Sequence, residues 1–261
     1  MSHVMASTPW MVLPRRSASA RFKLFCLPYA GTGASLFHPW SDKLASTLEV
    51  CPIQLPGREN RVTEQSFATL EPLVQTLADV LPPVLDGPYA LFGYSMGALV
   101  AFELTRELRR RQLRLPSKLL VAAHPAPHLV RRRKPVHHLP ESRFIQAIRR
   151  LHGTPDAVFE HGELRALMLP LLRADFAVCE TYAHEADAPL ECPITAFGGH
   201  HDHEVNRREL EAWREQTRAE FSLRLIPGGH FFIHTASAML VGGIHDELAG
   251  YTQPTGVLRP W

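Results

Sequence analysis

The stretch YALFGYSMGALVAFELTRELRRR, residues 89–111, carries the strongest structural signal in the chain. Tyr89–Tyr94 is apolar and strand-like, and Met96–Arg111 has apolar residues at helical spacing. Between them, G-Y-S-M-G at 93–97 has the G-x-S-x-G pattern of a tight strand-to-helix turn that presents a serine hydroxyl. Its two glycines allow the strand and the helix to approach closely. This context predicts a nucleophilic Ser95, and an incidental glycine-rich turn is the alternative interpretation.

Strand-like and helix-like segments alternate on both sides of this turn. Strands are expected at Phe22–Pro28, Val50–Leu55, Lys118–Ala123, Ile194–Gly198 and Phe221–Ile226. Helices are expected at Ser35–Leu48, Phe67–Leu85, Asn206–Arg218 and Ala236–Ala249. Such alternation indicates an α/β fold with a mostly parallel sheet and helices on both faces.

The alternation is interrupted between about residues 125 and 189. Here the sequence predicts only helices, at Glu141–Leu151, Leu164–Leu172 and Ala174–Tyr182. We therefore expect one α/β domain over residues 21–250 with a helical lid insertion at about 125–189. Residues 1–20 lack periodicity and are predicted to be a mobile leader, and residues 251–261 are predicted to be a poorly ordered tail.

The composition excludes several classes of protein. The 261 residues carry a formal net charge of only +2, which disfavours a duplex-DNA partner. The sequence has neither a signal-peptide pattern nor an apolar run long enough to cross a membrane, so a cytoplasmic location is expected. Four scattered cysteines without a C-x-x-C pair indicate reduced thiols rather than a disulfide framework. A monomer is the expected state, because the closing helices show no apolar stripe that requires a partner.

A serine nucleophile needs a base that is itself oriented by a carboxylate. In the α/β-hydrolase fold, which the serine turn between the strand and the helix indicates, these residues follow in the order Ser, acid, His. His230 comes in P-G-G-H directly after a predicted strand, and Asp202 follows the preceding strand. The predicted catalytic residues are therefore Ser95, Asp202 and His230. Asp175 in the insertion is a weaker candidate for the acid, and capping of the next helix is the alternative role for Asp202.

Acyl transfer also requires hydrogen-bond donors for the tetrahedral oxyanion. The N–H of Met96 directly follows the nucleophile, and the Y-A-G turn at 29–31 follows the first strand. We predict an oxyanion hole formed by the backbone N–H groups of Met96 and Ala30. Residues 29–31 can also be read as an ordinary turn.

The run His200-His201-Asp202-His203 raises the possibility of a zinc site. Adjacent side chains at a strand end point in different directions, and no H-E-x-x-H motif or spaced second cluster accompanies them. The sequence therefore predicts neither a metal nor a cofactor.

Several motifs together resemble one family. They are L-P-Y-A-G at 27–31, Q-L-P-G-R-E-N-R at 54–61, G-Y-S-M-G at 93–97, L-H-G-T-P at 151–155, L-P-L-L-R-A-D-F at 169–176, P-L-x-C-P-I at 189–194 and G-G-H-F-F at 228–232. The chain resembles the type II (external) thioesterases of polyketide and nonribosomal peptide biosynthesis over residues 22–249. It departs from them at Gly31-Thr32, where the family usually has Gly-Gly, and this affects the assignment of the oxyanion loop.

This resemblance implies hydrolysis of acyl groups stalled on the phosphopantetheine arm of carrier proteins, through an acyl-Ser95 intermediate. It makes the insertion a lid whose apolar residues line an acyl pocket or simply pack together: Phe144, Ile148, Leu151, Leu167, Met168, Leu171 and Phe176. Arg109–Arg111, Arg114 and Arg131–Lys134 are candidates for docking a carrier, with plain solvated faces as the alternative. Another serine hydrolase or acyltransferase of the same fold, acting on small esters or thioesters, is the rival function.

Overall fold

The computed structural model describes residues 8–12, 21–44, 48–130 and 132–252. Its six strands form one parallel sheet in the order β2-β1-β3-β4-β5-β6. The strands are β1 (Phe22–Leu27), β2 (Leu48–Pro52), β3 (Tyr89–Tyr94), β4 (Lys118–Ala122), β5 (Ile194–Gly199) and β6 (Phe221–Ile226). The predicted parallel α/β architecture is therefore confirmed, and the carboxyl ends of all six strands lie along one edge.

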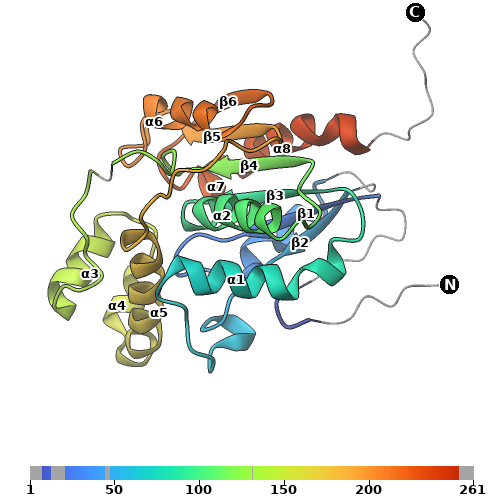
Figure 1. Ribbon diagram of the computed structural model, residues 1–261. Helices are drawn as coiled ribbons and strands as arrows, with labels where there is room; N and C mark the ends of the chain where they lie inside the picture. The colour runs from blue at the N-terminus through green and yellow to red at the C-terminus, as the bar shows by residue number, and fades with distance from the viewer. Residues whose placement is uncertain (1–7, 13–20, 45–47, 131, 253–261) are drawn as a thin grey trace, which may run out of the picture.

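Helices cover both faces of the sheet (Figure 1). On one face lie α1 (Leu70–Val80), α2 (Met96–Arg110) and α6 (Arg207–Glu211). On the other lie α7 (Phe232–Thr235), α8 (Ser237–Thr252) and the 3₁₀ helix Ala34–Trp40. Successive side chains of the central strands β1, β3 and β4 mostly enter opposite cores, which explains why these strands are largely apolar. The edge strand β6 instead carries Ser222 and Arg224 between its apolar residues.

Three helices separate β4 from β5: α3 (Glu141–Arg149), α4 (Asp156–Glu160) and α5 (Gly162–Glu180). Figure 1 shows them grouped at the left, beyond the end of β4. They have a small core of their own, which includes Phe144, Ile148 and Phe159. Because the chain leaves from a strand's carboxyl end, this insertion stands at the edge where the predicted catalytic residues also lie.

Some helices differ from the sequence prediction. The two segments expected at 164–172 and 174–182 are one continuous helix, α5, which accommodates Pro170 in its interior. The helix expected over Ser35–Leu48 is a 3₁₀ helix that ends at Trp40, and β2 already begins at Leu48. Pro39 lies inside that helix, where it cannot donate a backbone hydrogen bond. Among the described residues, no helix is long and apolar enough to cross a membrane.

Part of the predicted leader, residues 8–12, packs against the domain. Trp10 is buried, its carbonyl accepts a hydrogen bond from the Gln54 N–H at 2.9 Å, and Met11 pairs with Ile53 in an antiparallel bridge. The guanidinium carbon of Arg61 lies 4.1 Å from the centre of the Trp10 ring. Residues 1–7, 13–20 and 253–261 lie outside the described part of the chain.

Candidate active site

Ser95 stands at the turn between β3 and α2 with φ 51° and ψ −114°, a conformation that is rare for a residue with a side chain. Its N–H donates to the Ala122 carbonyl of β4 at 2.8 Å. A Cβ at Gly93 would lie 2.1 Å from the Gly97 carbonyl oxygen, and one at Gly97 would lie 2.2 Å from the Leu27 carbonyl oxygen. Only glycine fits at these two positions, which explains the G-x-S-x-G pattern.

The structure brings the three predicted side chains together from three separate strand ends. His230 Nε2 lies 3.4 Å from Ser95 Oγ, and His230 Nδ1 lies 2.9 Å from Asp202 Oδ2. The Asp202 side chain is buried, and its Oδ1 accepts hydrogen bonds from the N–H groups of Glu204 (2.7 Å) and Val205 (3.2 Å). An ionised Asp202 accepts only, so this network assigns the proton to His230 Nδ1 and leaves Nε2 facing the serine.

Tyr94, next to Ser95 in the sequence, contacts the turn that carries His230 and packs in the same core as Phe232 and Ile233. Its hydroxyl donates to the His230 carbonyl at 2.5 Å and accepts from the Ile233 N–H at 3.3 Å. Burial raises the pKa of the Tyr94 phenol well above its usual value, so the hydroxyl keeps its proton. Tyr94 therefore fixes the backbone of His230, whose side chain contacts Ser95.

The structure places the two predicted oxyanion donors in two different segments, and their role stays a prediction. Met96 is the first residue of α2, where a backbone N–H has no acceptor within the helix. Ala30 lies in the loop after β1 and is followed by Gly31 at φ +81°. The N–H of Gly31 donates to Asp175 Oδ2 at 2.7 Å, so it does not serve as an oxyanion donor in this arrangement. Asp202, and not Asp175, contacts His230.

A cavity of about 390 Å³ lies between this loop and α5. Tyr29 and Gly31 form part of its wall, and the predicted lid residues Leu167, Met168 and Leu171 line it. Phe144 and Ile148, also predicted as pocket candidates, instead pack inside the insertion. Only part of the predicted apolar set therefore faces this cavity.

Three polar contacts around the site were not predicted from the sequence. The Tyr29 hydroxyl lies 2.8 Å from His234 Nε2, and Arg58 forms a buried ion pair with Asp175. The third is the Tyr94 contact described above. Burial lowers the pKa of His234 and raises that of Tyr29 to about 12, which favours an uncharged pair. The motifs quoted above include Tyr29, Arg58, Tyr94 and Asp175, but they did not indicate which side chains pair.

The run at 200–203 is not arranged as a metal site. Within the described residues, no group of three or more His, Cys, Asp or Glu side chains is placed to hold a metal ion. Asp202 instead bonds His230 and two backbone N–H groups. All four cysteines are free thiols.

Comparison with known proteins gives consistent results. A thioesterase-domain family model matches residues 22–248. The gramicidin S biosynthesis protein GrsT of Aneurinibacillus migulanus is 43% identical over 241 residues, which are 92% of this chain and 94% of GrsT.

Two solved structures share the fold at substantial sequence identity. The RedJ thioesterase of the prodiginine pathway in Streptomyces coelicolor is 39% identical, with a TM-score of 0.83 over 89% of this chain and 88% of RedJ. The type II thioesterase BorB of the borrelidin biosynthetic cluster is 36% identical, with a TM-score of 0.84 over 93% of this chain and 98% of BorB. These structures confirm the α/β-hydrolase fold that the sequence predicted. The matched domain and these relatives show that the chain belongs to the thioesterase family.

Proposed function

We propose that this protein is a type II thioesterase that hydrolyses acyl thioesters from the phosphopantetheine arms of carrier proteins. Its role would be to clear stalled or misprimed carriers of a polyketide or nonribosomal peptide synthetase. The observation that carries the proposal is the position of His230, whose two ring nitrogens face Ser95 and Asp202. The family membership and the pathways named for GrsT and BorB support the substrate class.

In the proposed acylation step, Ser95 Oγ attacks the thioester carbonyl carbon while His230 Nε2 takes the hydroxyl proton. Asp202 stabilises the imidazolium through Nδ1–H and keeps the ring oriented. Negative charge develops on the carbonyl oxygen, where the N–H groups of Met96 and Ala30 are the proposed donors. Collapse of the tetrahedral intermediate breaks the C–S bond, and the pantetheine sulfur leaves as a thiol with the proton from His230.

In the proposed second step, His230 takes a proton from water as the water oxygen attacks the acyl carbon. Collapse then returns the proton to Ser95 and releases a carboxylic acid. The serine lies at the amino end of α2, a 15-residue helix whose dipole also favours negative charge at this point. No metal and no cofactor is required for this chemistry.

The cavity beside the oxyanion loop is the proposed acyl pocket. Most of its apolar lining comes from the α/β domain and from α5, as a carbon chain requires: Leu36, Val62, Leu167, Met168 and Leu171. Arg58 and Glu59 add charged groups to its wall. The wall from α5 comes from the insertion, which we propose acts as a lid. Cross-linking the insertion to the core would then suppress turnover of an acyl-carrier protein, and unchanged turnover would argue against lid motion.

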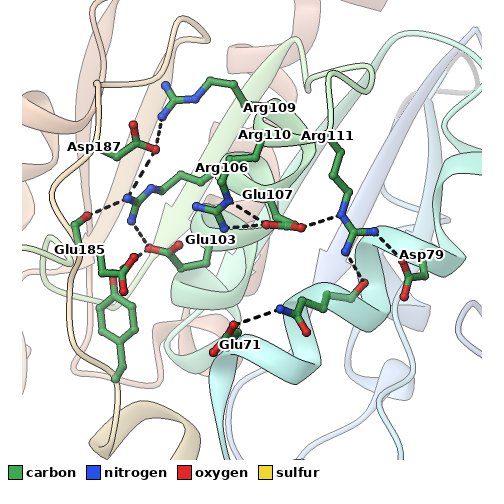
Figure 2. Close-up of polar contacts among 12 residues, drawn as sticks. Glu71, Asp79, Glu103, Arg106, Glu107, Arg109, Arg110, Arg111, Glu185 and Asp187 are labelled. Atoms are coloured by element: carbon green, nitrogen blue, oxygen red, sulfur yellow. Dashed lines mark hydrogen bonds and ion pairs between the residues drawn. The ribbon is translucent and has the colours of Figure 1, made fainter.

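The arginine-rich segments differ in their availability for docking a carrier. Figure 2 shows the run at 109–111 engaged with acidic side chains of its own chain. Arg109 pairs with Asp187 at 2.7 Å, and Arg111 pairs with Asp79 and Glu107. The Arg109 and Arg111 side chains are only 24% and 30% exposed, so docking on this run is disfavoured.

The second basic segment is more exposed. Arg132 and Arg133 have side chains 71% and 59% exposed. Each pairs with a less exposed glutamate, Glu209 in α6 and Glu204 just before it. Arg131 lies outside the described residues. We therefore place the proposed contact with acidic carrier proteins on Arg132 and Arg133. A cytoplasmic location and a monomeric state are part of the same proposal.

The decisive experiment is intact-mass analysis of a panel of acyl-loaded carrier proteins incubated with the wild type, Ser95→Ala or Ser117→Ala. We expect deacylation by the wild type and by the Ser117→Ala control, and none by Ser95→Ala. Parallel assays with acyl-pantetheine thioesters and oxygen esters compare kcat/KM between substrate classes. A preference for oxygen esters, or deacylation by Ser95→Ala, would contradict the proposal.

A further inference from the structure

Two segments singled out in the sequence meet in space, although the proposed chemistry uses neither. Arg58, in the loop after β2, and Asp175, on α5, are 117 residues apart in the chain. The guanidinium faces the carboxylate in a two-point contact, with Nη1 2.9 Å from Oδ2 and Nη2 2.8 Å from Oδ1. The side chains are only 4% and 3% exposed. This pair joins the insertion to the core.

The same pair also holds the loop after β1. Asp175 Oδ2 accepts the Gly31 N–H at 2.7 Å, and Arg58 Nη1 donates to the Thr32 carbonyl at 3.1 Å. Leu172, one turn earlier on α5, fills the space beside Gly31, where a Cβ would lie 2.5 Å from its Cδ2 atom. The insertion thus contacts the loop after β1 through both a hydrogen bond and side-chain packing.

The energetics favour a positioning role over a stabilising one. A buried ion pair loses hydration on both partners, so replacement of the pair by apolar side chains of similar volume is often neutral or stabilising. Removal of one partner alone leaves an uncompensated buried charge. A pair that adds little net stability still fixes the position of everything bonded to it. Here that includes the peptide between Ala30 and Gly31.

We propose that Asp175, held by Arg58, is a positioning residue that aligns the oxyanion loop only when α5 lies on the core. The inference rests on the proposed function, because it takes the Ala30 N–H as an oxyanion donor. Closure of the lid and completion of the oxyanion hole are then one event. An open lid leaves Ser95 and His230 in place but lacks part of the stabilisation of the tetrahedral intermediate.

The test uses two variants, Asp175→Ala and the double variant Arg58→Met/Asp175→Leu. The double variant removes both charges at once and so leaves no unpaired buried ion. Glu247→Gln is the control, because it removes a similarly buried carboxylate paired with Lys118 outside the site. Each protein is assayed with a small acyl thioester. Two inhibitors are also compared: a trifluoromethyl ketone, which forms a tetrahedral adduct with Ser95, and a thioether analogue of the substrate.

We expect both Asp175 variants to lose about tenfold or more in kcat with little change in KM, because removal of a whole oxyanion donor costs 10²–10³-fold in kcat. Affinity for the trifluoromethyl ketone should fall by the same factor, and affinity for the thioether should not change. The double variant should melt near the wild-type temperature. The control should keep its kcat.

Wild-type kcat in the folded double variant would overturn the inference, as would equal losses of affinity for the two inhibitors. Failure of the proposed function has a different signature. A wild type that cleaves small acyl thioesters but not carrier-bound ones contradicts the carrier substrate, while the comparison of kcat between variants still decides the role of Asp175.

Discussion

Tyr94→Phe isolates the effect of one hydroxyl on His230, the proposed catalytic base. The substitution keeps the buried ring but removes the donor to the His230 carbonyl and the acceptor for the Ile233 N–H. Leaving buried polar groups without partners costs about 1–3 kcal/mol. For a chain of this size that corresponds to a melting temperature lower by about 2–12 °C. A histidine turn that shifts by a fraction of an ångström should also lower kcat by about 10- to 100-fold.

Tyr89→Phe is the matched control at the other end of the same strand. Its hydroxyl donates to the Arg114 carbonyl at 2.6 Å, and its ring is equally buried. We expect a comparable loss of melting temperature with an unchanged kcat on a small acyl thioester. Thermal denaturation and steady-state kinetics on the two variants therefore separate stability from positioning. Equal kcat values for Tyr94→Phe and Tyr89→Phe would refute the assignment of the Tyr94 hydroxyl to the histidine turn.

Three further predictions concern the glycine-rich turn at Ser95, stability at acidic pH and the docking of a carrier protein. Gly97→Ala places a Cβ 2.2 Å from a backbone carbonyl of β1 and should destabilise the protein by about 1–3 kcal/mol or more, whereas Gly87→Ala, with open space around it, should melt like the wild type. Burial opposes ionisation of Glu247, but hydrogen bonds from its partners outweigh this and lower its pKa from 4.5 to about 2. The contribution of ionised Glu247 to the free energy of unfolding is therefore complete above about pH 4.5 and lost as the pH falls through about 2. Glu247→Gln should make the free energy of unfolding less dependent on pH in this range. An unchanged pH dependence would contradict the lowered pKa. Reversing Arg132 and Arg133 to glutamate should raise KM for an acyl-carrier protein but not for a small thioester, and an unchanged carrier KM would exclude this docking surface.

The sheet and the positions of Ser95, Asp202 and His230 were predictable because each depends on local pattern. A strand followed by a glycine-rich turn identifies where a side chain leaves the sheet, and parallel strands bring all such points to one edge. The structure places the three side chains in a chain of contacts. Their catalytic roles remain a prediction, which the Ser95→Ala experiment addresses.

Other features depend on contacts between distant segments, and no local pattern reveals them. The pairing of Arg58 with Asp175 requires α5 to lie on the core, and an aspartate in a helical segment reads equally well as a surface residue. Trp10 follows no periodicity, yet its ring is buried beside Arg61. The continuity of α5 past Pro170 likewise depends on packing, because local propensity favours a break at a proline.

The insertion departs from β4 and returns on β5, which are neighbouring strands in register from Leu119↔Ile194 onward. Because these strands are parallel, the segment crosses from the carboxyl end of β4 to the amino end of β5, and it can be transplanted as a module since its length does not alter the strand order. Recombination between relatives at these two points would exchange the α5 wall of the proposed acyl pocket without altering Ser95 or His230. A transplanted segment must still supply a carboxylate where Asp175 stands, or the recipient's Arg58 is left buried without its counterion.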